Sequence, residues 1–133
     1  YEPVRCVRTE RYKYIRYWDE EWRKTNLSNI DESGTKAFFM ERGLTERRKA
    51  GEALYDLVYD PGERCNVAGQ PEYEEIRRDM AKRLYAVQER TEDPILEGPI
   101  PVREGWKVNC RECEKASSKN PEDYVSPGGN KKI

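Results

Sequence analysis

The chain has 133 residues, which suffices for one domain with a modest core. Charged residues make up 38% of it, and 25 basic and 26 acidic side chains give a formal net charge of -1, which argues against a dedicated polyanion binder. No run approaches the roughly eighteen apolar residues of a membrane span. We therefore expect neither a nucleic acid nor a membrane as a partner.

Three segments have the composition of β-strands. Residues 4–8 and 11–18 are rich in β-branched and aromatic side chains and are joined by two residues, so they predict a β-hairpin. Residues 52–59 predict a third strand, and apolar side chains on both of its faces favour a central position in the sheet. The sequence Asp60-Pro61-Gly62-Glu63 predicts a tight turn after it.

One long amphipathic helix is predicted over residues 71–90. Pro71 suits a first helical turn, and Asp93-Pro94 ends the pattern. The helix has one narrow apolar stripe, so we expect it to cover one face of the sheet. The stripe consists of Tyr73, Ile76, Met80, Leu84 and Val87. The expected fold class is α+β: a small antiparallel sheet of three to four strands packed against one long C-terminal helix, with an extended Pro/Gly-rich tail.

Two further regions differ in composition from this module. Residues 19–51 form a charged and polar insert, in which residues 33–35 are expected to start a short helix over residues 36–42 that stops at Gly43. Residues 95–133 form the tail, which we expect to be partly disordered, most of all from residue 111 to the Ser126–Asn130 run. The domain boundaries are therefore 1–94, with the insert at 19–51, and 95–133.

Catalytic motifs are absent from the sequence, which contains no His, no Gly-rich phosphate loop and no nucleophile elbow. Asp31, Glu32, Ser33 and Lys36 crowd one loop and could contact a ligand, although polar loops are commonly just solvated. Of these, Asp31, Ser33 and Lys36 are the candidate contact residues. Alternating Tyr and Arg in residues 5–23 suit a nucleic-acid platform, but they equally suit a half-buried strand.

The four cysteines are too few and too unevenly placed to predict a disulfide framework or a compartment. Cys110 and Cys113 have the spacing of half a zinc site, which Cys6 and Cys65 would have to complete. These two belong to separate elements, so incidental thiols are the alternative, and we expect no metal site.

Three segments in order carry a family resemblance: VRTERYKYIRYW from Val7, ALYDLVYDPGERCNVAG from Ala53, and PEYEEIRRDMAKRL from Pro71. Together they resemble the C-terminal subdomain of the formylglycine-dependent sulfatases, where an Arg-Thr-x-Arg-x-Lys-Tyr strand precedes Leu-Tyr-Asp-Leu, Asp-Pro-x-Glu and Asn-Leu-Ala. Val67 replaces the usual Leu. The insert SNIDESGTKAFFMERG is similar to the branch that contains heparan N-sulfatase, the sulfamidase.

The resemblance implies a hydrolase of sulfate esters or sulfamates whose formylglycine and calcium lie in an N-terminal catalytic domain. Formylglycine arises in a Cys/Ser-x-Pro/Ala-x-Arg motif, which none of the four cysteines here begins. The resemblance therefore implies a non-catalytic, inactive part of a sulfatase, without cofactors of its own, that completes the fold and lines the substrate entrance. Its implied partners are the catalytic domain in cis and a sulfated glycan, which a cation such as Lys36 suits. Members of the family are often exported, but the compartment is not readable here.

A free-standing binding module is the alternative from a different class. It would use the Cys110–Cys113 tail for a metal or the basic aromatic hairpin for nucleic acid. Stoichiometric zinc lost on Cys110→Ser would distinguish it from the sulfatase interpretation.

Overall fold

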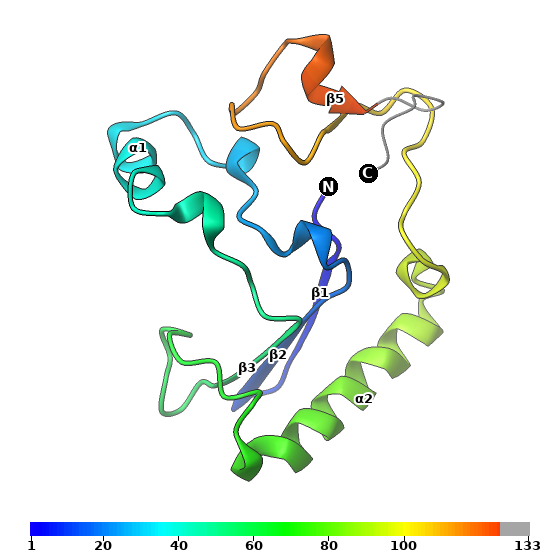
Figure 1. The fold of residues 1–133 in the computed structure, drawn as a ribbon. Coiled ribbons are helices and arrows are strands. Elements are labelled where there is room, and N and C mark those ends of the chain that lie inside the picture. The colour runs from blue at the N-terminus through cyan, green and yellow to red at the C-terminus, as the bar shows by residue number, and fades with distance from the viewer. Residues whose placement is uncertain (126–133) are drawn as a thin grey trace. The chain divides into compact units, whose positions relative to one another are not determined.

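The computed structural model describes residues 1–125, and the chain divides into two compact units. The sheet–helix unit comprises Val4–Glu20 and Ala50–Gly98, and the loop unit comprises Tyr1–Pro3, Glu21–Lys49 and the chain from Pro99 onward. Figure 1 shows the elements of both units. Among residues 1–125, no helix is long and apolar enough to cross a membrane.

The sheet–helix unit contains the three-stranded antiparallel sheet that the sequence predicts. Its strands are β1 (Val4–Arg8), β2 (Tyr12–Tyr17) and β3 (Glu52–Asp56), in the order β1-β2-β3. Cys6 lies opposite Ile15, and Ile15 lies opposite Ala53. Alternate residues of β2 therefore face opposite sides, and Tyr14 is buried against the helix with 2% of its surface exposed.

The prediction that residues 52–59 form a central strand is wrong, because β2 is central and β3 ends at Asp56. Ala53 and Leu54 are buried although β3 is an edge strand. A loop covers that edge: Val67 N–H donates to Leu54 O at 2.9 Å, and Asn66 Oδ1 accepts from Leu54 N–H at 2.9 Å. The loop thus takes the place of a further strand.

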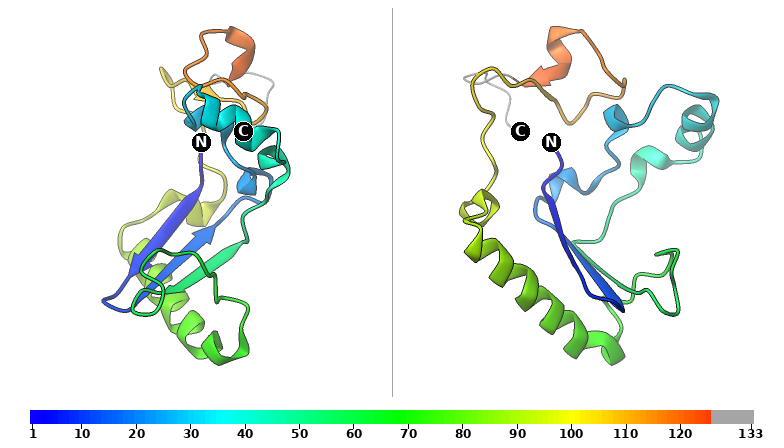
Figure 2. Two further views of the ribbon diagram at one scale, coloured as in Figure 1. Left: turned by 90° about the vertical axis from the view of Figure 1, so that its left-hand side faces the viewer. Right: turned by 180° about the vertical axis from the view of Figure 1, so that it is seen from behind.

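The long helix runs across one face of the sheet (Figure 2). A 3-10 turn at Pro71–Tyr73 leads into α2 (Glu74–Arg90), which confirms the predicted helix. Met80 and Leu84 are buried as expected, but Val87 is 40% exposed and Gln88 is only 2% exposed. Val87 was therefore wrongly placed in the buried stripe. The buried core consists of Tyr14, Leu54, Val67, Met80 and Leu84.

Gln88 is buried because it has a polar partner at the end of the helix. Its Nε2 donates to Asp93 Oδ2 at 3.3 Å, and the same carboxylate accepts two hydrogen bonds from Arg5, at 2.6 and 2.8 Å. The side chains at positions 76, 80, 84 and 88 follow one another at the four-residue spacing of a helix face. Arg5 thereby connects β1 to the residues that follow α2.

The loop unit holds the short elements. α1 (Gly34–Met40) forms where the sequence predicts a short helix, two residues earlier than expected, and the chain turns at Gly43 with a φ of 80°. β4 (Val108–Asn109) and β5 (Tyr124–Val125) pair antiparallel. Within residues 1–125, the remaining 3-10 turns of this unit are Glu21–Arg23, Leu27–Asn29, Leu44–Glu46 and Pro121–Asp123, and Pro94–Glu97 is a 3-10 turn of the sheet–helix unit.

The sequence allows a fourth strand in the tail but locates neither β4 nor β5, which pair in a sheet of their own. Each has two residues, which is too short for an alternating pattern to show. They flank a small cluster of Cys110, Cys113 and Val125, against which Val102 packs. The expectation of disorder in the Ser126–Asn130 run lies outside the described residues.

Candidate functional site

The residues of the motif segments bind one another within the sheet–helix unit. Thr9 Oγ1 accepts from Tyr12 N–H at 3.0 Å and closes the hairpin turn. Arg11 donates to the Asp56 carboxylate from Nε at 3.0 Å and from Nη2 at 2.8 Å. Asp56 is 3% exposed, and the hydrogen bond from Arg11 holds the pKa of its carboxyl below the usual range. The strand motif and the Leu-Tyr-Asp-Leu motif therefore form one ion pair, in which the Asp56 carboxylate is buried and the Arg11 side chain is 48% exposed.

The turn after β3 is tied down by the other motif residues. Asp60 Oδ2 accepts from Arg64 N–H at 2.7 Å and from Cys65 N–H at 2.8 Å. Glu63 accepts from Lys13 Nζ at 2.7 Å, which connects the Asp-Pro-x-Glu turn to β2. These polar groups fix the path of the chain, and their charges have partners inside the unit.

Asn66 completes this arrangement at the edge of the sheet. Its Oδ1 accepts from Leu54 N–H at 2.9 Å and from Ala68 N–H at 3.0 Å, while its Nδ2 donates to Glu52 O at 3.0 Å. One amide side chain thus satisfies two backbone groups of β3 that an adjacent strand would otherwise pair, and one N–H of its own loop. The Asn of the Asn-Leu-Ala motif has this structural role here.

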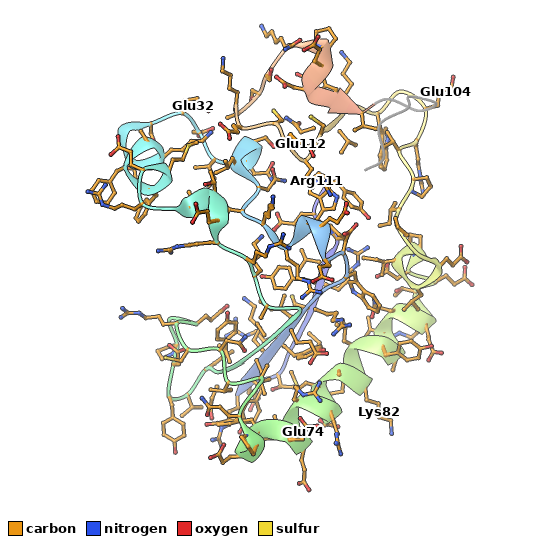
Figure 3. The ribbon with its side chains drawn as sticks, in the orientation of Figure 1. Glu32, Glu74, Lys82, Glu104, Arg111 and Glu112 are labelled. Carbon is orange, nitrogen blue, oxygen red and sulfur yellow. The ribbon has the colours of Figure 1, made fainter. Side chains whose placement is uncertain are left out.

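An ion network joins the helix to the sheet. Glu52 of β3 accepts from Arg16 Nη1 at 2.5 Å and from Arg77 Nη1 at 2.6 Å, and Arg77 also binds Glu74 at 2.9 Å. The hydrogen bonds that Arg77 donates to Glu74 and Glu52 raise its pKa. Glu74 lies at the start of α2, whereas Lys82 points away from the sheet (Figure 3).

Two shallow grooves lie along α2, within the same unit. The larger, of about 750 Å³, is charged, but Arg11 is paired with Asp56 and Arg83 with Asp79 at 2.7 Å. The smaller, of about 380 Å³, includes Trp18, with the Arg16 guanidinium 5.6 Å from the ring centre. Neither groove gathers a nucleophile with a general base.

The candidates Asp31, Ser33 and Lys36 lie at the start of α1 in the loop unit. Ser33 Oγ accepts from Lys36 N–H at 3.1 Å and caps the helix. Lys36 is 3% exposed, and its Nζ donates to Ile30 O at 3.1 Å, to Glu32 Oε1 at 2.6 Å and to Glu114 O at 2.5 Å. Asp31 is exposed. The structure thus brings Ser33 and Lys36 together, and both side chains form hydrogen bonds within the loop unit. A sugar contact by these residues stays a prediction.

Glu32 belongs to the same polar loop and contacts Lys36 directly. Figure 3 shows it at the chain segment that enters α1. The hydrogen bond from Lys36 lowers the pKa of its carboxyl. The spacing of four residues between Glu32 and Lys36 is a known signal for such a pair, whereas the contact with Glu114, 78 residues away, has no local signal.

The cysteines differ in their surroundings. Cys6 and Cys65 are exposed, and Cys110 and Cys113 are buried. Within residues 1–125, the structure brings together no group of three or more His, Cys, Asp or Glu side chains that could hold a metal ion.

Comparison with known proteins relates the chain to a sulfatase. No protein-family model matches the chain. The ulvan-active sulfatase of Formosa agariphila is 31% identical over 105 residues, which correspond to 75% of this chain and 20% of that protein. The chain spans about a fifth of the length of this relative. Most of the chain is therefore sulfatase-related in sequence.

Proposed function

We propose that this chain is the non-catalytic C-terminal portion of a sulfatase and that it completes the fold of that hydrolase. The observation that carries the proposal is the 31% identity to a sulfatase over 105 residues. The order of hairpin, third strand, turn and helix agrees with the order of the motif segments in that family. The internal pairing of Arg11, Lys13, Asp56 and Glu63 supports a structural role for these motifs.

The catalytic groups of the proposed enzyme belong to another part of the protein. Cys6 is followed by Val-Arg-Thr-Glu, Cys65 by Asn-Val-Ala-Gly, and Cys113 by Glu-Lys-Ala-Ser, so these contexts do not fit formylglycine formation. Cys110, followed by Arg-Glu-Cys-Glu, does not fit it either. We therefore assign no step of sulfate hydrolysis to this chain, and we expect formylglycine and calcium in the catalytic domain, which is the proposed partner in cis.

The substrate class that we propose is a sulfated glycan. The relative is named for activity on ulvan. The loop of residues 26–36 is the proposed part of the substrate entrance, with Asp31, Ser33 and Lys36 as its contact residues. The internal bonds of Ser33 and Lys36 favour a division of roles, in which these two residues shape the loop and the exposed Asp31 is available to a sugar hydroxyl.

Two observations test the proposal. The genomic reading frame should extend upstream through a Cys/Ser-x-Pro/Ala-x-Arg motif, and the protein encoded by that frame should hydrolyse a sulfate ester or a sulfamate. The 133-residue chain alone should hydrolyse neither. Comparing the two substrates in the long protein also tests the sulfamidase branch. A stop codon directly before Tyr1, without a separately encoded catalytic part, would contradict the proposal, as would turnover by the isolated chain.

A further inference from the structure

Cys110 and Cys113 lie at the two ends of one tight turn in the loop unit. Cys113 N–H donates to Cys110 O at 3.0 Å, and residues 111–112 form the turn between them. A turn of this kind holds its first and fourth Cα atoms within about 7 Å. A disulfide needs Cα atoms about 4.4–6.8 Å apart, so the backbone already has a suitable span.

Both thiols are buried in the same small cluster. Cys110 is 7% exposed and Cys113 is 4% exposed, and both pack with Val125. Cys110 Sγ donates to Glu122 O at 3.7 Å, and Cys113 Sγ donates to Lys115 O at 3.4 Å. Thiols are weak donors, so little is lost when these hydrogen bonds are given up.

A small cavity is lined by one of the two cysteines. It measures about 240 Å³ and is lined by Cys113 together with Leu27, Arg111 and Glu112, among others. Arg111 and Glu112, the two residues of this turn, are labelled in Figure 3. Cys110 does not line this cavity. A reagent that enters this cavity therefore meets Cys113 rather than Cys110.

We propose that Cys110 and Cys113 form an intramolecular disulfide by exchange with a low-molecular-weight disulfide such as oxidised glutathione. The Cys113 thiolate attacks one glutathione sulfur, forms a mixed disulfide and releases one glutathione thiolate. The Cys110 thiolate then attacks Cys113 Sγ, and a second glutathione thiolate leaves. The two protein thiols lose two electrons to the reagent, and their two protons go to the released glutathione. The proposal does not depend on the sulfatase assignment.

The disulfide closes a four-residue loop at the base of the β4–β5 pairing. Each of these strands has only two residues, and the cluster around them is small. Few apolar contacts hold this segment. A disulfide there lowers the conformational entropy of the unfolded segment and so stabilises the folded one. The folded chain should therefore favour the disulfide more than the denatured chain does.

Peptide mapping of the full chain tests the pairing directly. The protein is equilibrated with reduced and oxidised glutathione, denatured, alkylated with iodoacetamide and digested with trypsin. Arg111 lies between the two cysteines, so cleavage after Lys107, Arg111 and Lys115 leaves residues 108–111 and 112–115 as separate peptides unless a disulfide joins them. We expect the joined pair, with Cys6 and Cys65 found outside it. The Cys6→Ser/Cys65→Ser variant should give the same joined pair.

Two further measurements address mechanism and folding. With Cys110→Ser, the reaction should stop at a mixed disulfide between Cys113 and glutathione. The equilibrium constant for forming the disulfide should be about tenfold higher in the native chain than in urea. Alkylation of all four cysteines at an oxidising glutathione ratio would overturn the proposal. Protection of Cys110 and Cys113 that a chelator abolishes would overturn it as well, since it would indicate a metal.

Discussion

The charged ammonium group of Lys36 is buried inside the loop unit. Its side chain is 2% exposed, and it connects the segment before α1 with Glu114. Lys36→Met keeps most of the side-chain volume and removes the ammonium, which leaves the Ile30 and Glu114 carbonyl groups without this donor. We expect the free energy of unfolding to fall by about 2 kcal/mol, as for a lost charged hydrogen bond in a buried site.

The matched control for Lys36→Met is Lys82→Met on the exposed side of α2. We expect this variant to change the free energy of unfolding by less than about 0.5 kcal/mol. Urea denaturation of both variants measures the difference. Equal stability of Lys36→Met and the unchanged chain would show that the buried ammonium contributes nothing net.

Asp56 should make the sheet–helix unit sensitive to acid. The hydrogen bond from Arg11 lowers the pKa of its carboxyl in the folded chain, so the unfolded chain takes up a proton first as the pH falls. The stabilisation is complete well above the ordinary Asp pKa of 3.8, begins to fall about one pH unit above that value and is lost as the pH falls through the lowered value. We expect stability to decrease below about pH 5, where protonation of carboxylates begins to matter.

Asp56→Asn should flatten this acid dependence. Asp93, whose pKa is lowered chiefly by Arg5, contributes in the same direction, so part of the dependence should remain. Asp79→Asn, at a more exposed ion pair with Arg83, is the control. The measurement is the free energy of unfolding in urea between pH 7 and pH 3. An unchanged slope in Asp56→Asn would refute the assignment.

At the scale of elements, the edge of β3 depends on one side chain. Asn66 serves as donor and acceptor for Leu54, Ala68 and Glu52, in the place where an adjacent strand would pair. Asn66→Ala leaves the Leu54 N–H without its acceptor, although Leu54 itself is fully buried. We expect a loss of about 1–3 kcal/mol in the free energy of unfolding, the usual cost of an unsatisfied buried group.

Hydrogen exchange locates this effect. In Asn66→Ala, the backbone amide of Leu54 should exchange faster than in the unchanged chain. The relative exchange rates among the backbone amides of β1 should stay the same. Gln70→Ala, an exposed amide side chain before the helix, is the control. If Leu54 stays equally protected, another group must cover the edge of β3.

At the scale of the whole molecule, local sequence patterns predict the helices and strands, but they do not reveal which side chains contact one another in the folded chain. The hairpin, α1 and α2 follow from alternation, capping and helical spacing, which act over a few residues. Val87 was placed in the core because it is apolar, whereas Gln88 is buried because Asp93 and Arg5 form a distant polar site. The backbone N–H of Leu54 at the edge of β3 is paired by Asn66, and no strand pattern in the sequence reveals this contact.

The candidate site also depends on tertiary contacts that the sequence does not reveal. A polar loop with Asp31, Ser33 and Lys36 suggests a ligand, and the sequence does not reveal that Glu114 lies within reach of Lys36. The turn between Cys110 and Cys113 likewise depends on β4 and β5, whose two-residue strands carry no periodic signal. Residue type therefore indicates which side chains are candidates for a site, and tertiary contacts determine whether each one binds within the chain or remains exposed.

The proposed division of roles in the substrate loop can be tested in the active long protein. Asp31 is exposed, so Asp31→Ala should leave folding stability within about 0.5 kcal/mol of the unchanged protein. If its carboxylate accepts a hydrogen bond from a sugar hydroxyl in both ground and transition states, KM should rise by about tenfold with kcat unchanged. Asn29→Ala, an exposed neighbour, should leave both constants unchanged. A fall in kcat at constant KM would instead place Asp31 in transition-state stabilisation, and no change in either constant would remove it from the substrate entrance.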